Sequence, residues 1–112
     1  MPLIAPVVTY SNAKQDKKKI LSQNKYKPGI YRWVNLKNQK SYIGSSISLS
    51  QRLKYYFSQQ SLQGSDLVIN RAILKHGLAN FSLEILEYCN CTDLATKKKY
   101  YLQKYRPEYN LK

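Results

Sequence analysis

Acidic residues are scarce in this sequence of 112 residues. Six Asp and Glu stand against 19 Lys and Arg, which gives a formal net charge of +13 at pH 7. So large an excess of one sign destabilises a compact chain through self-repulsion, and it therefore indicates a polyanionic partner. Nucleic acid is the first interpretation, and an anionic membrane is the second. Arginine binds phosphate in a bidentate manner and is the better candidate for a specific role; it occurs only at Arg32, Arg52, Arg71 and Arg106.

Residues that form metal sites and disulfides are also few. His76 is the only histidine, and Cys89 and Cys91 are the only cysteines. Their spacing suits neither a disulfide nor half of a zinc site, so we expect reduced thiols. No apolar run reaches the length that spans a membrane. The length fits one domain with a modest core.

One stretch has the pattern of a β-hairpin. Residues 30–35 alternate between the two faces of a strand, as a half-buried strand does. Polar turn residues follow at 37–40, and residues 41–45 form a second short strand. The chain therefore predicts two antiparallel strands joined by a short turn.

Such a hairpin brings two tyrosines together. Tyr31 and Tyr42 are expected near each other on one sheet, and Gly29 and Gly44 permit close backbone approach at its ends. For an isolated pair of tyrosines, packing within the sheet is the simpler interpretation. The surrounding motifs decide between packing and function.

Beyond the hairpin, the spacing of apolar residues predicts further regular structure. Gly77 and Pro107 stand where helices end. The predicted elements are a helix over residues 48–60, a helix over 67–76 capped by Asp66, a strand over 80–88 and a helix over 93–105 capped by Thr92.

Residues 1–28 are predicted to be a basic leader outside the core. Residues 12–27 are rich in lysine, and Ile20 and Leu21 are their only strongly apolar members. Alone, such a segment is disordered or a frayed helix. If it is ordered, a bound polyanion or a large assembly is the simplest cause.

Several motifs together resemble the GIY-YIG nuclease family, and most closely the fungal mitochondrial intron-encoded homing endonucleases. The resemblance covers about residues 27–111. It is carried by Gly29-Ile30-Tyr31, then ten residues before Tyr42-Ile43-Gly44, and further by Arg52-Leu53, the Asn80–Tyr88 stretch, Tyr100-Tyr101 and the Lys104–Asn110 stretch.

The resemblance implies that residues 29–112 form one domain with an α+β fold, in which helices flank a three-stranded antiparallel sheet. It also implies cleavage of DNA with one divalent metal ion. The tyrosines position or deprotonate water, an arginine stabilises the phosphate, and an asparagine completes the site. Carried over by motif, the candidate catalytic residues are Tyr31, Tyr42, Arg52, Tyr56 and Asn110.

One position departs from the family pattern. The family usually has glutamate two residues before its paired aromatics, and here that position is Lys98. Helical spacing places Lys98 on one face with Leu94 and Tyr101, directed towards the site. An ammonium cannot ligate Mg²⁺, which takes oxygen ligands. No metal site is therefore expected, although Glu87 and Glu108 remain open as substitute ligands.

Two hypotheses follow. In the first, the chain is a degenerate family member that binds nucleic acid without cutting it. In the second, it is an active or truncated DNA endonuclease that uses Mg²⁺. The family usually continues into a separate DNA-recognition region, and nothing of that kind fits after Asn110, which favours the first. The candidate nucleic-acid-binding residues are Lys14, Lys17, Lys18, Lys19, Arg52, Lys97, Lys98 and Lys99.

The expected partner is structured RNA in a mitochondrial ribonucleoprotein such as the ribosome, and no membrane is expected. Lys, Asn, Ile and Tyr are abundant, and their codons are rich in A and T, as in a mitochondrial genome. We therefore expect the protein in the mitochondrial matrix, with RNA favoured over DNA.

Overall fold

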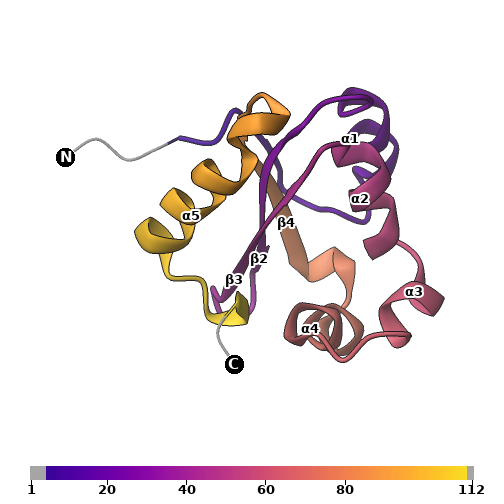
Figure 1. Ribbon diagram of the computed structural model, residues 1–112. Helices are drawn as coiled ribbons and strands as arrows, with labels where there is room; N and C mark the ends of the chain where they lie inside the picture. Colours follow the sequence, from indigo (N-terminus) through magenta and orange to yellow (C-terminus); the bar gives the residue numbers. More distant parts are fainter. Residues whose placement is uncertain (1–4, 111–112) are drawn as a thin grey trace.

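The computed structural model describes residues 5–110 and has an α+β fold. One four-stranded antiparallel sheet, with strand order β1-β4-β2-β3, lies between helices α1–α4 on one face and helix α5 on the other (Figure 1). The elements are β1 (Val8–Tyr10), α1 (Lys17–Gln23), β2 (Gly29–Asn35), β3 (Ser41–Ser46), α2 (Leu49–Tyr56), α3 (Gln59–Gln63), α4 (Val68–His76), η1 (Leu78–Asn80), β4 (Phe81–Tyr88), η2 (Cys91–Asp93), α5 (Leu94–Tyr105) and η3 (Glu108–Asn110).

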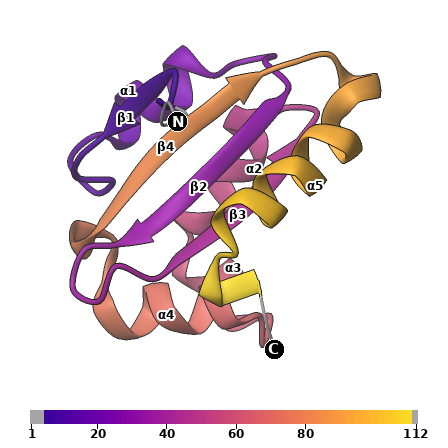
Figure 2. The same cartoon turned by 90° about the vertical axis from the view of Figure 1, so that its left-hand side faces the viewer.

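The predicted hairpin is confirmed as β2 and β3. Tyr31 lies opposite Gly44, and Trp33 lies opposite Tyr42. β2 is a central strand between β4 and β3, and helices pack against both faces of the sheet, as Figure 2 shows for α5. Its side chains are correspondingly buried at six of seven positions, so the alternation in its sequence separates two cores rather than core from solvent.

The two cores lie on opposite faces of the sheet. The larger contains Tyr31 and Trp33 with residues of α1, α2 and α4. The smaller, under α5, contains Ile30 and Ile43 with Leu94. Since successive side chains of a strand point to opposite faces, Ile30 and Tyr31 belong to different cores.

The predicted helix over residues 48–60 is two helices. α2 ends at Tyr56, and α3 begins at Gln59 because the Ser58 hydroxyl accepts a hydrogen bond from the Ser61 backbone N–H at 3.2 Å. A serine in extended conformation with this bond is an N-cap, which starts a new helix.

Two of the predicted caps are wrong. Leu67 precedes α4, and Asp66 instead forms an exposed ion pair with Arg71 at 3.7 Å. Thr92 lies within η2, and α5 follows Asp93 without a side-chain cap. The predicted stop at Gly77 is confirmed, because this residue has φ of 82°, a conformation that glycine adopts freely.

The prediction that residues 1–28 stand outside the core is wrong for the described part. β1 pairs with β4 and adds a fourth strand to the predicted three, with Tyr10 opposite Leu83. Ala13 and Ile20 are fully buried in the larger core. The segment is ordered by its own packing, so its order does not require a bound polyanion. Residues 1–4 and 111–112 lie outside the described residues.

A buried asparagine joins this segment to the sheet. Asn24 is fully buried and donates to the Ile20 carbonyl at 2.7 Å. It also donates to the Tyr10 hydroxyl at 3.2 Å and accepts from the Tyr88 hydroxyl at 2.7 Å. These three bonds fix the end of α1 between β1 and β4.

Within the described residues 5–110, no helix has the length and apolar character needed to cross a membrane.

Removing the buried side chain of α1 tests whether this segment belongs to the core. Ile20→Ala is expected to lower the free energy of unfolding by about 2–5 kcal/mol, because it leaves a cavity at a fully buried position. Urea denaturation followed by circular dichroism measures this. Lys18→Ala, on the exposed side of the same helix, is the control and should change stability by less than about 0.5 kcal/mol. Equal, small effects of both changes would contradict the packing.

Candidate nucleic-acid site

Two buried phenols form the centre of the candidate site. Tyr31 of β2 and Tyr56 of α2 are 1% and 0% exposed, and their hydroxyl oxygens lie 2.7 Å apart in a hydrogen bond. Residues 31 and 56 come from a strand and the helix that covers it, so the bond joins sheet to helix. The sequence predicted both residues as site residues, and the structure brings them together.

Gly44 makes room for the Tyr31 ring. A Cβ atom at Gly44 would lie 2.4 Å from both Cζ and the hydroxyl oxygen of Tyr31, far inside van der Waals contact. The ring of Tyr31 therefore lies directly across strand β3 at its glycine. Tyr31, in the first half of the motif, therefore packs in the space that the glycine of the second half leaves open.

Arg52 lies beside the phenols. Its guanidinium donates a long hydrogen bond of 3.5 Å to the Tyr56 hydroxyl, and its Cζ stands 4.7 Å from the Tyr55 ring centroid and 5.3 Å from that of Tyr56. Cation–π contacts of this kind hold the half-buried guanidinium in place. Sequence reasoning missed Tyr55, although its spacing of three residues from Arg52 in a helix is the signal for such a contact.

Both buried phenols stay protonated near neutral pH. Burial, with a smaller contribution from nearby Tyr42, raises the pKa of Tyr31 to about 12 against the lowering effect of Tyr56 and Arg52. Burial also raises the pKa of Tyr56, and a charge on Tyr31 would raise it again. A phenol with a raised pKa is a hydrogen-bonding group rather than a ready general base.

Tyr42 lies at the border of this cluster. It is half-buried, and its ring centroid is 6.4 Å from that of Tyr31. Among the three tyrosines and the arginine predicted for the site, Tyr42 and Arg52 are the ones with exposed surface, because Tyr31 and Tyr56 are buried. These two are therefore positioned to meet a ligand.

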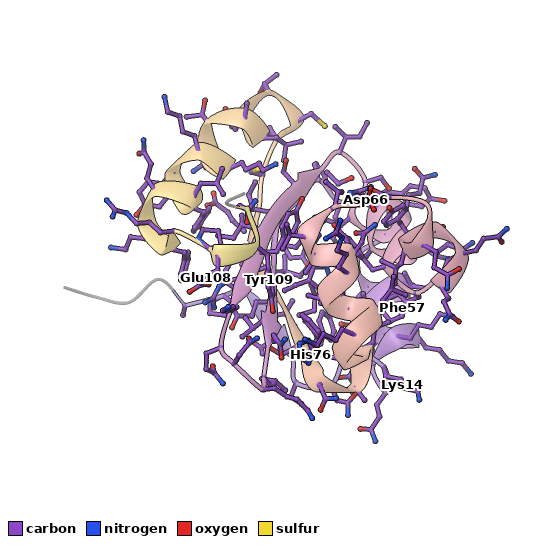
Figure 3. All side chains as sticks on the ribbon, turned by 90° about the horizontal axis from the view of Figure 1, so that it is seen from below. Lys14, Phe57, Asp66, His76, Glu108 and Tyr109 are labelled. Carbon is purple, nitrogen blue, oxygen red and sulfur yellow. The ribbon has the colours of Figure 1, made fainter. Side chains whose placement is uncertain are left out.

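Asn110 is committed to the backbone of β3. Its side-chain amide donates to the Ile43 carbonyl at 2.9 Å, and its oxygen accepts from the Ile43 N–H at 2.8 Å. Glu108 accepts from the Ser41 N–H at 3.2 Å in the same way. The segment of residues 108–110, where Figure 3 labels Glu108 and Tyr109, thus covers part of the outer edge of the sheet. Asn110 holds the site strand in place rather than joining the phenols.

Lys98 lies on the sheet-facing side of α5. It stands between the buried Leu94 and Tyr101 in the helix and is half-buried itself. Because α5 covers the opposite face of the sheet from Tyr31 and Tyr56, the helix backbone stands on the other side of β3 from the phenols. Within the described residues, Lys98 has no ion-pair partner.

Lys97 differs from its neighbour. Its ammonium pairs with the Glu87 carboxylate at 2.9 Å, and the other oxygen of Glu87 accepts from the Tyr101 hydroxyl at 2.8 Å. The hydrogen bond from Lys97 is the largest cause of a lowered pKa of Glu87. Lys97 is thus partly neutralised, whereas Lys99 is exposed.

The predicted lysines of the leader lie elsewhere. Lys14, Lys17, Lys18 and Lys19 are exposed on and before α1, which packs against α2. Figure 3 shows Lys14 well separated from Glu108 at the end of the chain. The predicted nucleic-acid-binding cations therefore do not form one cluster but lie on both sides of the sheet.

The carboxylates do not fit a metal site beside the phenols. Both oxygens of Glu87 are engaged, Glu84 pairs with Arg32 at 3.1 Å, and Glu108 is bound to the edge of β3. Among residues 5–110, no three His, Cys, Asp or Glu side chains converge into a possible metal site. Lys98 stands at the position where the family motif has glutamate, and its ammonium cannot ligate a metal ion.

The sequence and the fold are similar to those of known proteins. The family model of the GIY-YIG catalytic domain matches residues 27–110. The catalytic domain of the homing endonuclease I-TevI is 26% identical, with a TM-score of 0.61 over 75% of this chain and 94% of that chain. The N-terminal endonuclease domain of UvrC from Thermotoga maritima, a point mutant bound to its catalytic divalent cation, is 26% identical, with a TM-score of 0.62 over 88% of this chain and 98% of that chain.

Filling the space over Gly44 tests the packing of Tyr31. Gly44→Ala is expected to destabilise the fold by about 1–3 kcal/mol, because the new methyl group overlaps the Tyr31 ring. Thermal unfolding measures the shift. Gly64→Ala is the matched control: its Cβ would lie 3.4 Å from the nearest atom, an ordinary contact, and its φ is −77°. The control should keep or slightly raise the midpoint, since alanine restricts the unfolded chain. Similar midpoints for both variants would exclude the close packing.

Proposed function

The chain belongs to the GIY-YIG nuclease family, and we propose that it is a member that binds nucleic acid without cutting it. A nuclease-type domain implies binding to nucleic acid, and the net charge of +13 supports such binding. The loss of metal-dependent cleavage is the further part of the proposal.

The proposed loss of metal-dependent cleavage rests on Lys98 and its surroundings. This residue occupies the glutamate position of the family motif and has no ion-pair partner among the described residues. An ammonium at this position repels a divalent cation and attracts a phosphate. Both carboxylate oxygens of Glu87, on β4, are already engaged, one by Lys97 and the other by Tyr101.

The phenol cluster supports the same function. Tyr31 and Tyr56 remain protonated, so they donate and accept hydrogen bonds without taking a proton from water. Arg52 contributes a fixed guanidinium, the geometry that suits a phosphate. The cluster can therefore position a phosphodiester, but none of its groups takes the proton from the water that would cleave it.

We extend the proposal to the partner. Structured RNA in a mitochondrial ribonucleoprotein such as the ribosome, in the matrix, fits the excess of lysine and the abundance of residues whose codons are rich in A and T. The order of residues 5–28 no longer supports this part, since their own packing explains it. Charge and composition remain as its support.

A second candidate function is metal-dependent cleavage of DNA with Mg²⁺. The cluster of Tyr31, Tyr56 and Arg52 favours cleavage, because a site without activity has no chemical need for these three side chains. The packing of Tyr31 across Gly44 gives the cluster a structural need, however, which reduces this support.

A nicking assay separates the two functions. The unmodified protein is expected to leave supercoiled plasmid DNA intact in Mg²⁺ or Mn²⁺. Lys98→Glu is expected to show metal-dependent nicking if this one position carries the loss, because it restores an oxygen ligand. Lys99→Glu, with the same change of charge on the exposed neighbour, is the control and should stay inactive. Nicking by the unmodified protein would contradict the proposal.

The partner is tested by affinity purification under native conditions. We expect nucleic acid to copurify, to be removed by RNase and to resist DNase. In filter binding, affinity should fall steeply between 50 and 200 mM salt, by roughly 10³-fold or more if about six phosphates are contacted. Copurifying material that only DNase removes would exclude the RNA part of the proposal and leave binding itself intact.

A further inference from the structure

One aromatic side chain is displayed to solvent in a strained backbone conformation. Tyr26 is 91% exposed and has φ of 60°, in the left-handed region. A bulky residue pays about 1–2 kcal/mol for this conformation relative to an ordinary one. Lysine flanks it on both sides, as Lys25 and Lys27. Neither burial nor local backbone preference explains why a tyrosine stands here.

The turn that carries Tyr26 is fixed on both sides. The Lys27 carbonyl accepts from the Leu49 N–H at 2.9 Å, and the Asn24 carbonyl accepts from the Ser50 N–H at 3.2 Å. The Asn24 side chain is fully buried between three partners. The exposure of Tyr26 is thus the result of a held backbone geometry, so binding of a ligand there costs the protein little backbone conformational entropy.

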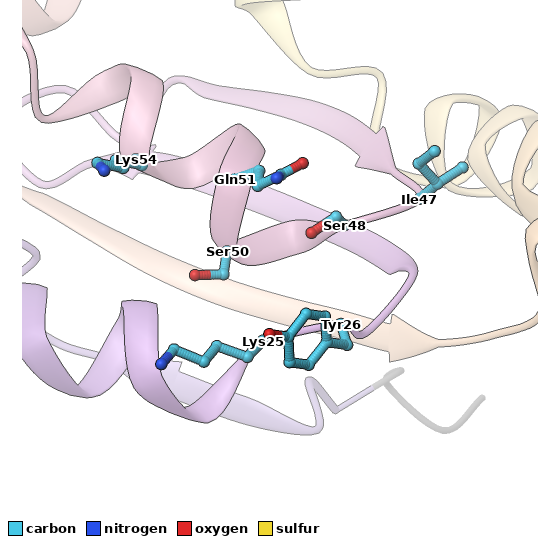
Figure 4. Close-up of a pocket in the computed structure, with 7 residues that line it drawn as sticks. All are labelled: Lys25, Tyr26, Ile47, Ser48, Ser50, Gln51 and Lys54. Carbon is cyan, nitrogen blue, oxygen red and sulfur yellow. The ribbon is translucent and has the colours of Figure 1, made fainter.

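The ring stands between two hollows. One, of about 540 Å³, is lined by Tyr26 with Ile47, Lys25 and Lys54 (Figure 4). The other, of about 410 Å³, is lined by Tyr26 with Lys27 and Tyr88. We call this surface the Tyr26 corner and define it by Lys25, Tyr26, Lys27, Ile47 and Lys54.

The chemistry of the Tyr26 corner is apolar and cationic. Ile47 is 69% exposed and adds to the ring an apolar surface. The Lys27 ammonium stands 4.8 Å from the Tyr88 ring centroid, which fixes its charge at the second hollow. Among the described residues that line the two hollows, none is acidic.

The start of helix α2, which borders the first hollow, is not what would bind an anion here. Two of its first backbone N–H groups already donate to the carbonyls of Asn24 and Lys27. Recognition therefore depends on the ring face and the ammonium groups. A flat aromatic ring flanked by cations is the combination that binds a nucleobase together with its neighbouring phosphates.

We propose that Tyr26 is a stacking platform for an unpaired base, and that Lys25, Lys27 and Lys54 hold the adjoining phosphates. This inference rests on the proposed binding of nucleic acid. It adds a contact outside the nuclease-type site, since Lys25 and Tyr26 precede the residues 27–110 that match the family model. An unpaired base is specified because only a base outside a duplex exposes its face to a side chain.

The test uses the full chain and 12-nucleotide single strands of RNA and DNA, each with one 2-aminopurine, beside the corresponding duplexes. Tyr26→Asn removes the ring and keeps a residue that tolerates positive φ. We expect it to weaken binding of the single strands by about ten-fold or more and to abolish quenching of 2-aminopurine. Binding of the duplexes should stay unchanged. The RNA and DNA strands show which sugar is preferred, and either preference supports stacking.

Tyr26→Phe is the matched control and should bind within about two-fold of the unmodified protein, because it keeps the ring. Lys25→Gln with Lys54→Gln should reduce the slope of log affinity against log salt by about one to two. Thermal unfolding confirms that the exposed substitutions leave the fold intact.

The outcomes separate this inference from the function on which it rests. If the unmodified protein binds single strands and Tyr26→Asn binds them equally well, stacking at Tyr26 is excluded while nucleic-acid binding stands. The same result would redirect the Tyr26 corner to a protein partner. If the unmodified protein binds neither strands nor duplexes, the proposed function fails, and this inference fails with it.

Discussion

The contact between the Tyr31 ring and Gly44 is the constraint on which the site depends. It presses a large side chain of the central strand across the glycine of the edge strand. The hydroxyl then reaches Tyr56 at 2.7 Å, and Tyr56 in turn lies beside Arg52. One contact therefore links β2, β3 and α2. The same contact also fills the core. A stable fold and a working site would therefore require the same residues at these positions.

The distribution of the few acids is equally consequential. Glu84 and Glu87 of one strand are paired with Arg32 and Lys97, at 3.1 and 2.9 Å. The scarce carboxylates thus neutralise cations next to the sheet instead of gathering at the phenols. Most of the remaining positive charge stays on the surface, where it repels itself and attracts polyanions. The structure and the composition therefore both favour a polyanionic ligand. Which polyanion binds depends on individual side chains at the surface.

The sequence predicted the fold where local patterns are strong. Alternation located β2 and β3, and a glycine that tolerates positive φ located the end of α4. The core role of residues 5–28 was missed, because Tyr10, Ala13 and Ile20 are too few to form a pattern and pack against residues far along the chain. In the site, motifs identified Tyr31 and Tyr56, whereas the commitment of Asn110 to a backbone follows only from three-dimensional proximity.

The docking of the Asn110 side chain on β3 has a consequence for association. Exposed strand edges recruit further strands, from other copies or from extended peptides. Here the side chain of Asn110 occupies both the N–H and the carbonyl of Ile43, as a neighbouring strand would. The opposite edge consists of β1, with only three residues. A sheet protected in this way resists growth by strand addition.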